Sequence, residues 1–434
     1  MIRRATWLVA VLFAAALLLG YVSSQPLAQA PGGDLVALTG ARLIDGTGRA
    51  PIQQATLLVR NGRIEAAGAS ADVQIPAGAV RVNVAGKTLM PGIINAHGHV
   101  EPSNTSTLPI RDQLVAQLRL YADYGVTAVY GLGADGPENV ALRREQEHGP
   151  LDRARVYAAG MITTKTVDEV RRDVNASADM GVDIIKFRLM GNANDIPPDA
   201  YGAIIDQAHK RGLMAAAHMY YTNDAWGLLK AGVDVFAHSV RDKDIDATLI
   251  AEMKRRNVGY IATLTRDLSV FVYETTPTFF SDPFFLRHVA EYRPQMTQVS
   301  DPAFQAKTRA SKEAQVIKVA LEQASRNVKI VADAGIPVAM GTDSGAPTGR
   351  WQGYFEHVEM ELMVKAGLTP MQTLVAATGG AARVMKLDSQ LGTLQPGKWA
   401  DFLVLNADPL ADIRNTRQID SVWIAGRRLR SANQ

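Results

Sequence analysis

The chain has 434 residues, more than a typical single domain, so we expect one large domain with a smaller one, or a barrel with additions. Hydrophobic residues make up 47% and charged residues 21%, as in a soluble globular enzyme. The net charge of +3 gives no reason to expect a nucleic-acid partner, and the absence of cysteine excludes disulfides, thiolate catalysis, cysteine-based zinc sites and a lipoprotein anchor.

The first 30 residues have the pattern of a secretory signal peptide. Arg3 and Arg4 precede an apolar run over residues 5–19, and small and polar residues follow it up to Ala30. The alternative is an uncleaved membrane anchor, because the run including Val22 approaches the length that spans a bilayer. We therefore expect an exported protein, periplasmic or extracellular, that touches the membrane only if this segment is retained.

Two short β-rich regions, residues 31–90 and 386–434, lie at opposite ends of the chain. The first contains "ATLLVRNGRIEAAG", in which Asn61-Gly62 between two apolar stretches predicts a tight hairpin. The second contains "ADFLVLNADPL" and "SVWIAGRRL", with Ala425-Gly426 as another turn. We predict that both regions form one small β-sandwich domain.

The middle of the chain, residues 91–385, alternates between apolar strand patterns and helical patterns. Several helical patterns end in glycine, the usual residue just past a helix C-terminus. Eight strands alternating with helices predict an α/β fold, a (β/α)8 TIM barrel. Its strands are expected in residues 92–97, 126–132, 154–160, 182–189, 213–219, 233–239, 259–265 and 336–343. The segment 268–330 has the character of an extended loop with extra helix, and we expect it to act as a lid.

The ends of these strands carry side chains that bind metal ions. In a TIM barrel the catalytic side chains project from the C-terminal ends of the strands. Residues two apart on a strand point the same way, so one ion could take both imidazoles of the first strand. Nitrogen and oxygen donors arriving from several strands favour a divalent ion, with zinc as the first expectation. The predicted ligands are His97, His99, Lys186, His218, His238 and Asp343.

Each of these residues also has an ordinary structural explanation when it is taken alone. Asp343 could cap the following helix, and Lys186 could extend its ammonium towards solvent. A buried ammonium, however, is costly without a partner and would repel a metal ion. Lys186 makes sense in the site if carbon dioxide has carboxylated it, because the resulting N6-carbamate could bridge two cations.

The chain resembles the metal-dependent amidohydrolase superfamily over about residues 35–430. "PGIINAHGH" is similar to its His-x-His motif, and "GTDSG" to its strand-8 aspartate motif. "HVEMELMVKAGLTPMQTLVAATGGAARVM" and "LGTLQPGKWADFLVL" resemble the imidazolonepropionase-like and Xaa-Pro dipeptidase-like group. Imidazolonepropionases themselves look mononuclear and lack a lysine at strand 4, so Lys186 argues against that activity. The resemblance implies a binuclear site with His97, His99 and Asp343 on one ion, His218 and His238 on the other, and carboxylated Lys186 bridging them.

This resemblance implies a metal-dependent hydrolase of an amide bond, most simply in a dipeptide or an N-acyl amino acid. A metal-bridging hydroxide would attack the carbonyl, with Asp343 acting as general acid and base. The alternative is a lactonase or an organophosphate or ester hydrolase on the same binuclear site, because the metal centre alone does not determine which electrophile is attacked. A non-catalytic scaffold is disfavoured because all six ligand positions are filled.

Four residues are expected to contact the small-molecule substrate. Arg188 lies two residues past Lys186 and so faces the same way, where it could hold a substrate carboxylate; a salt bridge at the barrel rim is the alternative. Arg266 is a further anion-binding candidate, with plain surface solvation as the alternative. Tyr220 and Tyr221 follow His218, and the resemblance implies that a tyrosine in this loop polarises the carbonyl, preferably Tyr220.

The remaining histidines are not expected to bind metal. His357 is expected on a helix face, and no role is assigned to His148, His209 or His288. We expect a homo-oligomer that binds neither nucleic acid nor, apart from its N-terminal segment, the membrane.

Overall fold

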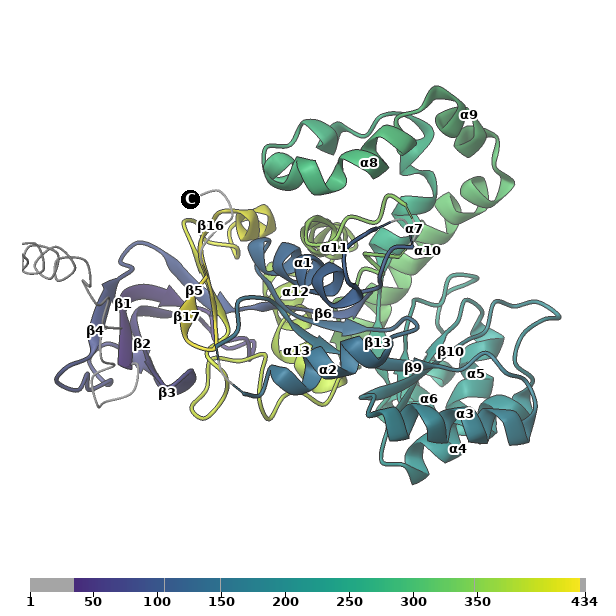
Figure 1. Ribbon diagram of the computed structural model, residues 1–434, viewed down its shortest axis with the longest axis horizontal. Helices are drawn as coiled ribbons and strands as arrows, with labels where there is room; N and C mark the ends of the chain where they lie inside the picture. Colours follow the sequence, from purple (N-terminus) through teal and green to yellow (C-terminus); the bar gives the residue numbers. More distant parts are fainter. Residues whose placement is uncertain (1–34, 105, 149, 347, 430–434) are drawn as a thin grey trace, which may run out of the picture. The chain divides into compact units, whose positions relative to one another are not determined.

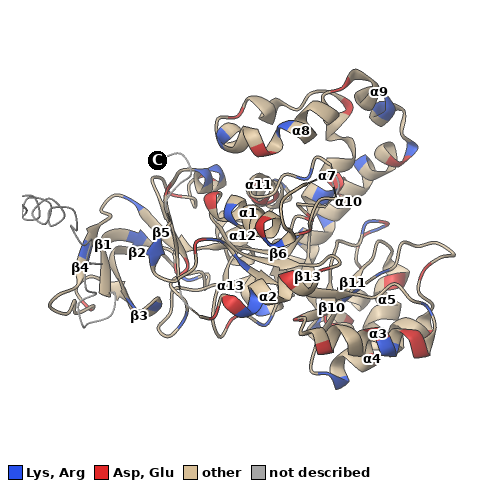
Figure 2. Ribbon diagram, viewed as in Figure 1, with Lys and Arg blue, Asp and Glu red and all other residues tan. Residues whose placement is uncertain are grey.

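The computed structural model describes residues 35–429 apart from residues 105, 149 and 347, so the predicted signal peptide lies outside the described residues. In the described part of the chain, no helix is both long enough and apolar enough to cross a bilayer. Figure 2 shows basic and acidic residues interspersed over helices and strands, in keeping with the small net charge.

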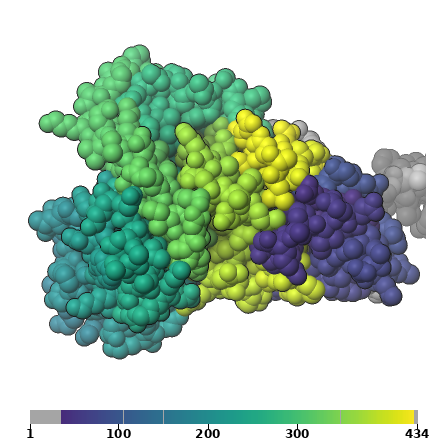
Figure 3. Space-filling view, turned by 180° about the vertical axis from the view of Figure 1, so that it is seen from behind, coloured from purple at the N-terminus to yellow at the C-terminus, as the bar shows by residue number. Residues whose placement is uncertain are grey.

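Both ends of the described chain build one eight-stranded sheet. Its order is β17-β16-β15-β5-β1-β2-β3, with β4 beside β1, and β5 pairs with β15 in antiparallel register. Figure 3 shows the C-terminal segment (yellow) beside the N-terminal strands (purple). The two-layer sandwich and its domain boundaries stay predictions. The strands are β1 (Leu35–Leu43), β2 (Ile52–Arg60), β3 (Arg63–Ala69), β4 (Val80–Asn83), β5 (Thr88–Pro91), β15 (Phe402–Leu405), β16 (Ile419–Ile424) and β17 (Arg427–Arg428).

The two turns predicted in this sheet are confirmed. Asn61 and Gly62 have φ angles of 51° and 79° and connect β2 directly to β3. Ala425 and Gly426, with φ angles of 49° and 72°, connect β16 to β17. Left-handed φ at both central residues is the geometry whose twist matches that of antiparallel strands.

Parallel strands alternate with helices through the middle of the chain (Figure 1). They form a six-stranded sheet, β14-β13-β12-β11-β10-β9, and a three-stranded sheet, β6-β7-β8. Every predicted strand overlaps an observed one, and the third is split into β8 and β9 at Ala158. The strands are β6 (Ile93–Gly98), β7 (Val126–Gly131), β8 (Arg155–Tyr157), β9 (Ala159–Met161), β10 (Ile184–Arg188), β11 (Met214–His218), β12 (Val235–Phe236), β13 (Gly259–Ile261) and β14 (Val338–Ala339).

Backbone hydrogen bonds connect β6 to the segment that follows β14. The amide of Ala96 donates to the carbonyl of Met340 at 2.9 Å, and the amide of His99 donates to that of Ser344 at 2.8 Å. The first and last strands of the predicted barrel therefore lie side by side.

The helices follow the strands in chain order, and several begin and end as the sequence predicts. The side chain of Thr166 accepts a hydrogen bond from the amide of Glu169 at the start of α3, and left-handed glycines, Gly181 and Gly232, end α3 and α5. The helices are α1 (Ile110–Asp123), α2 (Pro137–Glu145), α3 (Val167–Met180), α4 (Pro198–Lys210), α5 (Thr222–Ala231), α6 (Ala247–Arg256), α7 (Leu264–Phe271), α8 (Val289–Val299), α9 (Pro302–Ala310), α10 (Lys312–Asp333), α11 (Tyr354–Lys365), α12 (Pro370–Ala376) and α13 (Gly379–Val384), with 3-10 turns η1 (Val272–Glu274), η2 (Thr278–Ser281), η3 (Phe285–His288) and η4 (Ile413–Arg417).

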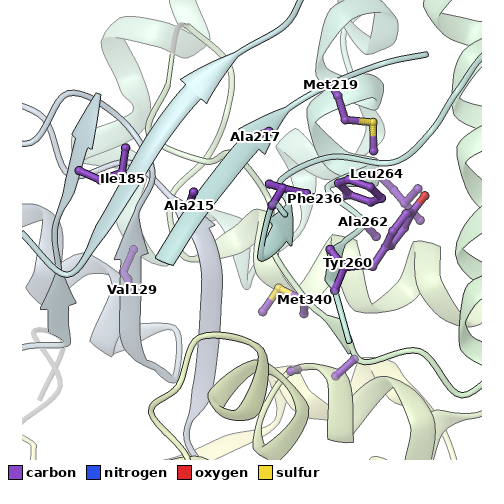
Figure 4. Packing of buried hydrophobic residues seen from close by; sticks show 14 of the residues in the cluster. Val129, Ile185, Ala215, Ala217, Met219, Phe236, Tyr260, Ala262, Leu264 and Met340 are labelled. Atoms are coloured by element: carbon purple, nitrogen blue, oxygen red, sulfur yellow. The ribbon is translucent and has the colours of Figure 1, made fainter. Parts of the chain in front are cut away.

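Alternation along the strands places polar side chains on the face opposite the helices. Ile185 belongs to the buried cluster drawn in Figure 4, whereas Ile184 and Ala216 belong to a second buried cluster. Because successive side chains point to opposite faces, Lys186 shares the face of Ile184, and His218 shares the face of Ala216. Both polar groups are thereby directed away from the helix layer.

The segment 268–330 holds more helix than the sequence predicted. It contains α8, α9 and most of α10, and Figure 1 shows α8 and α9 in the upper part of the view. An aromatic cluster anchors α8: the ring of Tyr292 lies 5.1 Å from that of Trp351, which is 5.2 Å from Phe285. The extra helix expected beside the extended loop therefore makes up most of this segment, and its role as a lid stays a prediction.

Candidate metal centre

The six predicted metal ligands line one cavity of about 820 Å³. They come from β6 and the loop after it, from β10 and β11, and from the loops after β12 and β14. All of them are buried, with at most 8% of any residue exposed. The structure therefore brings His97, His99, Lys186, His218, His238 and Asp343 together at one end of the parallel strands.

Their nitrogen and oxygen atoms converge. Nε2 of His97 and of His99 lie 3.1 Å and 2.8 Å from Oδ1 of Asp343. The ring of His238 is 4.6 Å from that of His97 and 4.1 Å from that of His218. Ligand atoms of His97, His238 and Asp343 all lie within 4.8 Å of one another, so a single ion could reach all three.

The protonation states of three histidines and of the aspartate in this cluster suit a metal ion. Burial and the neighbouring Lys186 lower the pKa of His97 to about 3, and burial holds the pKa values of His218 and His238 well below their usual range. Burial alone would raise the pKa of Asp343, but the guanidinium of Arg350 and hydrogen bonds from the histidines outweigh it and hold this pKa well below normal. Neutral imidazoles and an ionised carboxylate are the forms that ligate divalent ions.

Only 1% of the surface of Lys186 is exposed, and this burial lowers the pKa of its amine to about 7. The nearby Arg188 lowers it too, while Asp343 acts in the opposite direction. An amine with this pKa is largely uncharged above pH 7. It therefore repels a cation only weakly, and it has the free lone pair that reacts with carbon dioxide.

Two histidines are held through their second ring nitrogen. Nδ1 of His99 donates to Oε1 of Glu101 at 2.8 Å, and Nδ1 of His238 lies 2.6 Å from the hydroxyl of Thr263. Such partners fix the orientation of a metal-binding imidazole. Burial would lower the pKa of His99, but its hydrogen bonds to Asp343 and Glu101 raise it to about 9, so His99 must release a proton before it binds an ion.

One residue of this cluster and one residue beside it have strained backbones. Asp343 has a φ of 60° and Thr263 a φ of 50°, in the left-handed region that residues other than glycine rarely occupy. Strain of this kind costs about 1–3 kcal/mol per residue and persists only where the surroundings enforce it, often at active sites.

The four predicted substrate residues divide into two pairs. Arg188 and Arg266 line the cavity, whereas the described cavity lining does not include Tyr220 or Tyr221. The ring of Tyr220 lies 4.8 Å from the guanidinium of Arg241 and 4.7 Å from the ring of Tyr221, which is exposed. The substrate roles of the two tyrosines stay predictions.

The histidines that were not expected to bind metal lie outside the cavity lining. His357 is buried in α11, and both of its ring nitrogens are engaged, Nδ1 with the hydroxyl of Thr416 at 2.9 Å and Nε2 with the carbonyl of Tyr124 at 2.8 Å. The predicted helix-face position of His357 is confirmed.

Several residues that line the cavity were not predicted from the sequence. Arg350 forms an ion pair with Asp343, and its Nε donates to the hydroxyl of Ser269 at 3.0 Å. Glu291 and Tyr292 of α8 line the cavity from the segment expected to be a lid. Glu101, two residues after His99, could have been found from its spacing, whereas Arg350 reaches the site through a loop whose path no local pattern predicts.

A cluster of imidazoles, a carboxylate and a buried amine at one end of parallel strands defines the class: an α/β protein with a site suited to divalent metal ions. The family model described as "Amidohydrolase family" matches residues 88–429, so the chain belongs to the amidohydrolase family, whose members generally use divalent metals.

Similar proteins agree with this assignment. A candidate prolidase from Bifidobacterium longum is 26% identical, with 92% of this chain and 95% of that chain covered and a TM-score of 0.76. An Xaa-Pro dipeptidase with bound methionine is 17% identical, with 91% and 99% covered and a TM-score of 0.70. A 5-methylthioadenosine/S-adenosylhomocysteine deaminase from Symbiobacterium thermophilum is 24% identical, with 86% of this chain and 85% of that protein covered. The fold is thus TIM-barrel-like, and the chain is a hydrolase of this superfamily.

Proposed function

We propose that this protein hydrolyses the amide bond of a dipeptide or an N-acyl amino acid. One observation carries the proposal: the ligand atoms of His97, His238 and Asp343 converge in a cavity that Arg188 and Arg266 also line. The residues that could hold a water-activating metal ion thus lie in the same cavity as two guanidinium groups that could bind a substrate carboxylate. The similarity to a prolidase and to an Xaa-Pro dipeptidase supports this substrate class.

The proposed cofactor is a pair of divalent ions, with zinc as the first expectation. His97, His99 and Asp343 would hold one ion, and His218 and His238 the other, with N6-carboxylated Lys186 between them. Ligand atoms of His97, His238 and Asp343 lie within 4.8 Å of one another, so residues assigned to both ions would be close neighbours. Bound ions would polarise the substrate carbonyl and lower the pKa of water.

Asp343 is the proposed proton carrier. Its carboxylate is ionised, so it can accept a proton from the attacking water and later donate that proton to the leaving amine. Arg350 contacts Oδ2 of Asp343, while His97 and His99 contact Oδ1. The histidines thus approach one carboxylate oxygen of Asp343, and the arginine approaches the other.

The arginines are the proposed carboxylate anchor. Arg266 and Arg241 both donate to Oδ1 of Asp267, so two cations share one carboxylate beside the cavity. Arg188 also lines the cavity, where its charge lowers the pKa of Glu101. Guanidinium groups in this position favour a substrate that carries a carboxylate.

A parallel assay tests the substrate class. The protein loaded with zinc or manganese is given dipeptides, N-acyl amino acids, lactones, aryl phosphates and 5-methylthioadenosine. We expect turnover of the first two classes at the highest kcat/KM. Faster turnover of a lactone or aryl phosphate would replace the proposal by the alternative hydrolase, and absence of stoichiometric metal would point to a scaffold.

Replacing Asp343 with asparagine tests the proton carrier. Asparagine keeps the shape and tolerates a left-handed φ, so the variant should keep most of its metal while kcat falls about 10²–10⁴-fold. Asp333→Asn is a matched control, because Asp333 pairs with Lys329 at the exposed end of α10. Full activity of Asp343→Asn would contradict the role.

We further propose export to the periplasm or beyond and a homo-oligomeric state. Export is supported only by the charged and apolar pattern of residues 1–30. Mass measurement of the mature protein and size-exclusion chromatography with light scattering would test these two expectations.

A further inference from the structure

Helix α11 carries two buried glutamates that the site does not use directly. Glu356 and Glu359 are three residues apart, so they lie on one face of the helix, and both are completely buried. Neither lines the cavity. Each instead accepts three hydrogen bonds from groups that lie next to proposed metal ligands.

Glu356 is bonded to the neighbours of Asp343 and His97. Its Oε1 accepts from the hydroxyls of Thr342 at 2.9 Å and Ser344 at 2.6 Å, the two residues that flank Asp343. The same oxygen accepts from Nδ2 of Asn95 at 2.6 Å, and Oδ1 of Asn95 in turn accepts from the amide of His97 at 2.9 Å. One carboxylate oxygen therefore joins the segments that present two ligands.

Glu359 is bonded to the loop that orients His238. Its Oε1 accepts from the amide of Leu264 at 2.8 Å, and its Oε2 accepts from the amide and hydroxyl of Thr265 at 2.6 Å and 2.7 Å. These residues directly follow Thr263, whose hydroxyl lies 2.6 Å from Nδ1 of His238.

Each glutamate thus secures a loop that contains a left-handed residue, Asp343 in one and Thr263 in the other. A backbone in this region persists only when its surroundings enforce it. We propose that Glu356 and Glu359 are positioning residues which, from one helix, hold His97, His238 and Asp343 in the geometry that binds a metal ion. This inference rests on the proposed metal-dependent function.

The two glutamates differ in how they use their oxygens. All three bonds to Glu356 reach Oε1, and its Oε2 is buried with no hydrogen-bond partner in the described structure. A glutamine could keep these bonds through its amide oxygen. Glu359 uses both oxygens as acceptors, so a glutamine there would turn its NH2 group towards another donor and leave buried groups unpaired.

The test compares Glu356→Gln, Glu356→Ala and Glu359→Gln with the parent protein. Glu361→Gln is the matched control, because Glu361 lies on the same helix but pairs with Arg417 and is partly exposed. Zinc affinity is measured by competition with a chelating dye, folding by circular dichroism, and kcat and KM on the substrate that the parallel assay identifies.

We expect Glu359→Gln and Glu356→Ala to bind zinc about 10- to 100-fold more weakly, with a lower kcat at saturating zinc and an unchanged KM. Glu356→Gln and Glu361→Gln should match the parent. Parent-like zinc affinity in Glu359→Gln, or an equal loss in Glu356→Gln and Glu356→Ala, would overturn the inference. If Glu359→Gln does not fold, the comparison of the two Glu356 variants decides.

Zinc affinity also separates this inference from the proposed function. A parent protein that binds zinc but hydrolyses no amide would refute the function, while the affinities of the variants still judge the positioning role. A parent protein that binds neither zinc nor manganese would overturn both.

Discussion

Replacing Lys186 with methionine should stabilise the metal-free protein, and the gain should shrink as the pH rises. Burial lowers the pKa of Lys186 to about 7, whereas the unfolded chain keeps the ordinary value of 10.5. Between these values the unfolded state binds more protons, so the free energy of unfolding of the parent rises by about 1.4 kcal/mol per pH unit. Methionine removes this dependence. The free energy of unfolding of Lys186→Met should exceed that of the parent by about 4 kcal/mol at pH 7.5 and by about 1 kcal/mol at pH 9.5.

Urea unfolding of both proteins at the two pH values measures this difference. The samples are treated with a chelator and kept in bicarbonate-free buffer, so that neither metal nor a carbamate alters the amine. The charge of Lys186 is not among the main causes of the His99 pKa shift, so His99 titrates alike in both proteins. Burial, the largest cause, keeps His97, His218 and His238 neutral in both proteins over this pH range. Lys254→Met, at an exposed lysine of α6, serves as the control. An advantage that stays constant between pH 7.5 and 9.5 would refute the reasoning, because Lys186 would then not be a neutral amine in the fold.

Two further predictions concern buried charge. Arg155 and Asp401 form an almost fully buried ion pair, with Nε 2.6 Å from Oδ2, so Asp401→Asn should lower the free energy of unfolding by about 3–5 kcal/mol in urea titrations; a loss below about 1 kcal/mol would contradict this. Glu101→Gln removes the charge that supports His99 at 2.8 Å and should weaken zinc binding about tenfold in a competition titration. Unchanged zinc affinity would show that Glu101 does not support this ligand.

The strands could be predicted because each is an apolar run of suitable length between helical patterns. The third was broken into β8 and β9, a local interruption at Ala158 that apolarity does not reveal. Extra helix was expected in residues 268–330, but the position of α8 could not be predicted, for a different reason. Pro294 lies inside it, and proline usually ends a helix, but aromatic packing of Tyr292 against Trp351 holds this one in place. Tertiary contacts of this kind have no signature in a single sequence.

The six proposed ligands could be predicted because barrel strands deliver their last residues to one place. The structure brings them together in one cavity. The groups that orient them were missed. Thr263, Glu356 and Glu359 act through hydrogen bonds between segments far apart in the chain, and Arg350 reaches Asp343 from a loop. Such partners depend on the folded path of the backbone and not on local spacing.

The pairing of β5 with β15 has a consequence for synthesis. At about 5–20 residues per second, a ribosome needs roughly 15–60 s to make the chain between Pro91 and Phe402. Throughout that time β5 has one edge without its final partner, and an unpaired edge is a template for pairing with other chains. The sheet at the two ends of the chain is therefore the last part of this fold that can be completed, and the nascent protein depends on keeping that edge covered until it is.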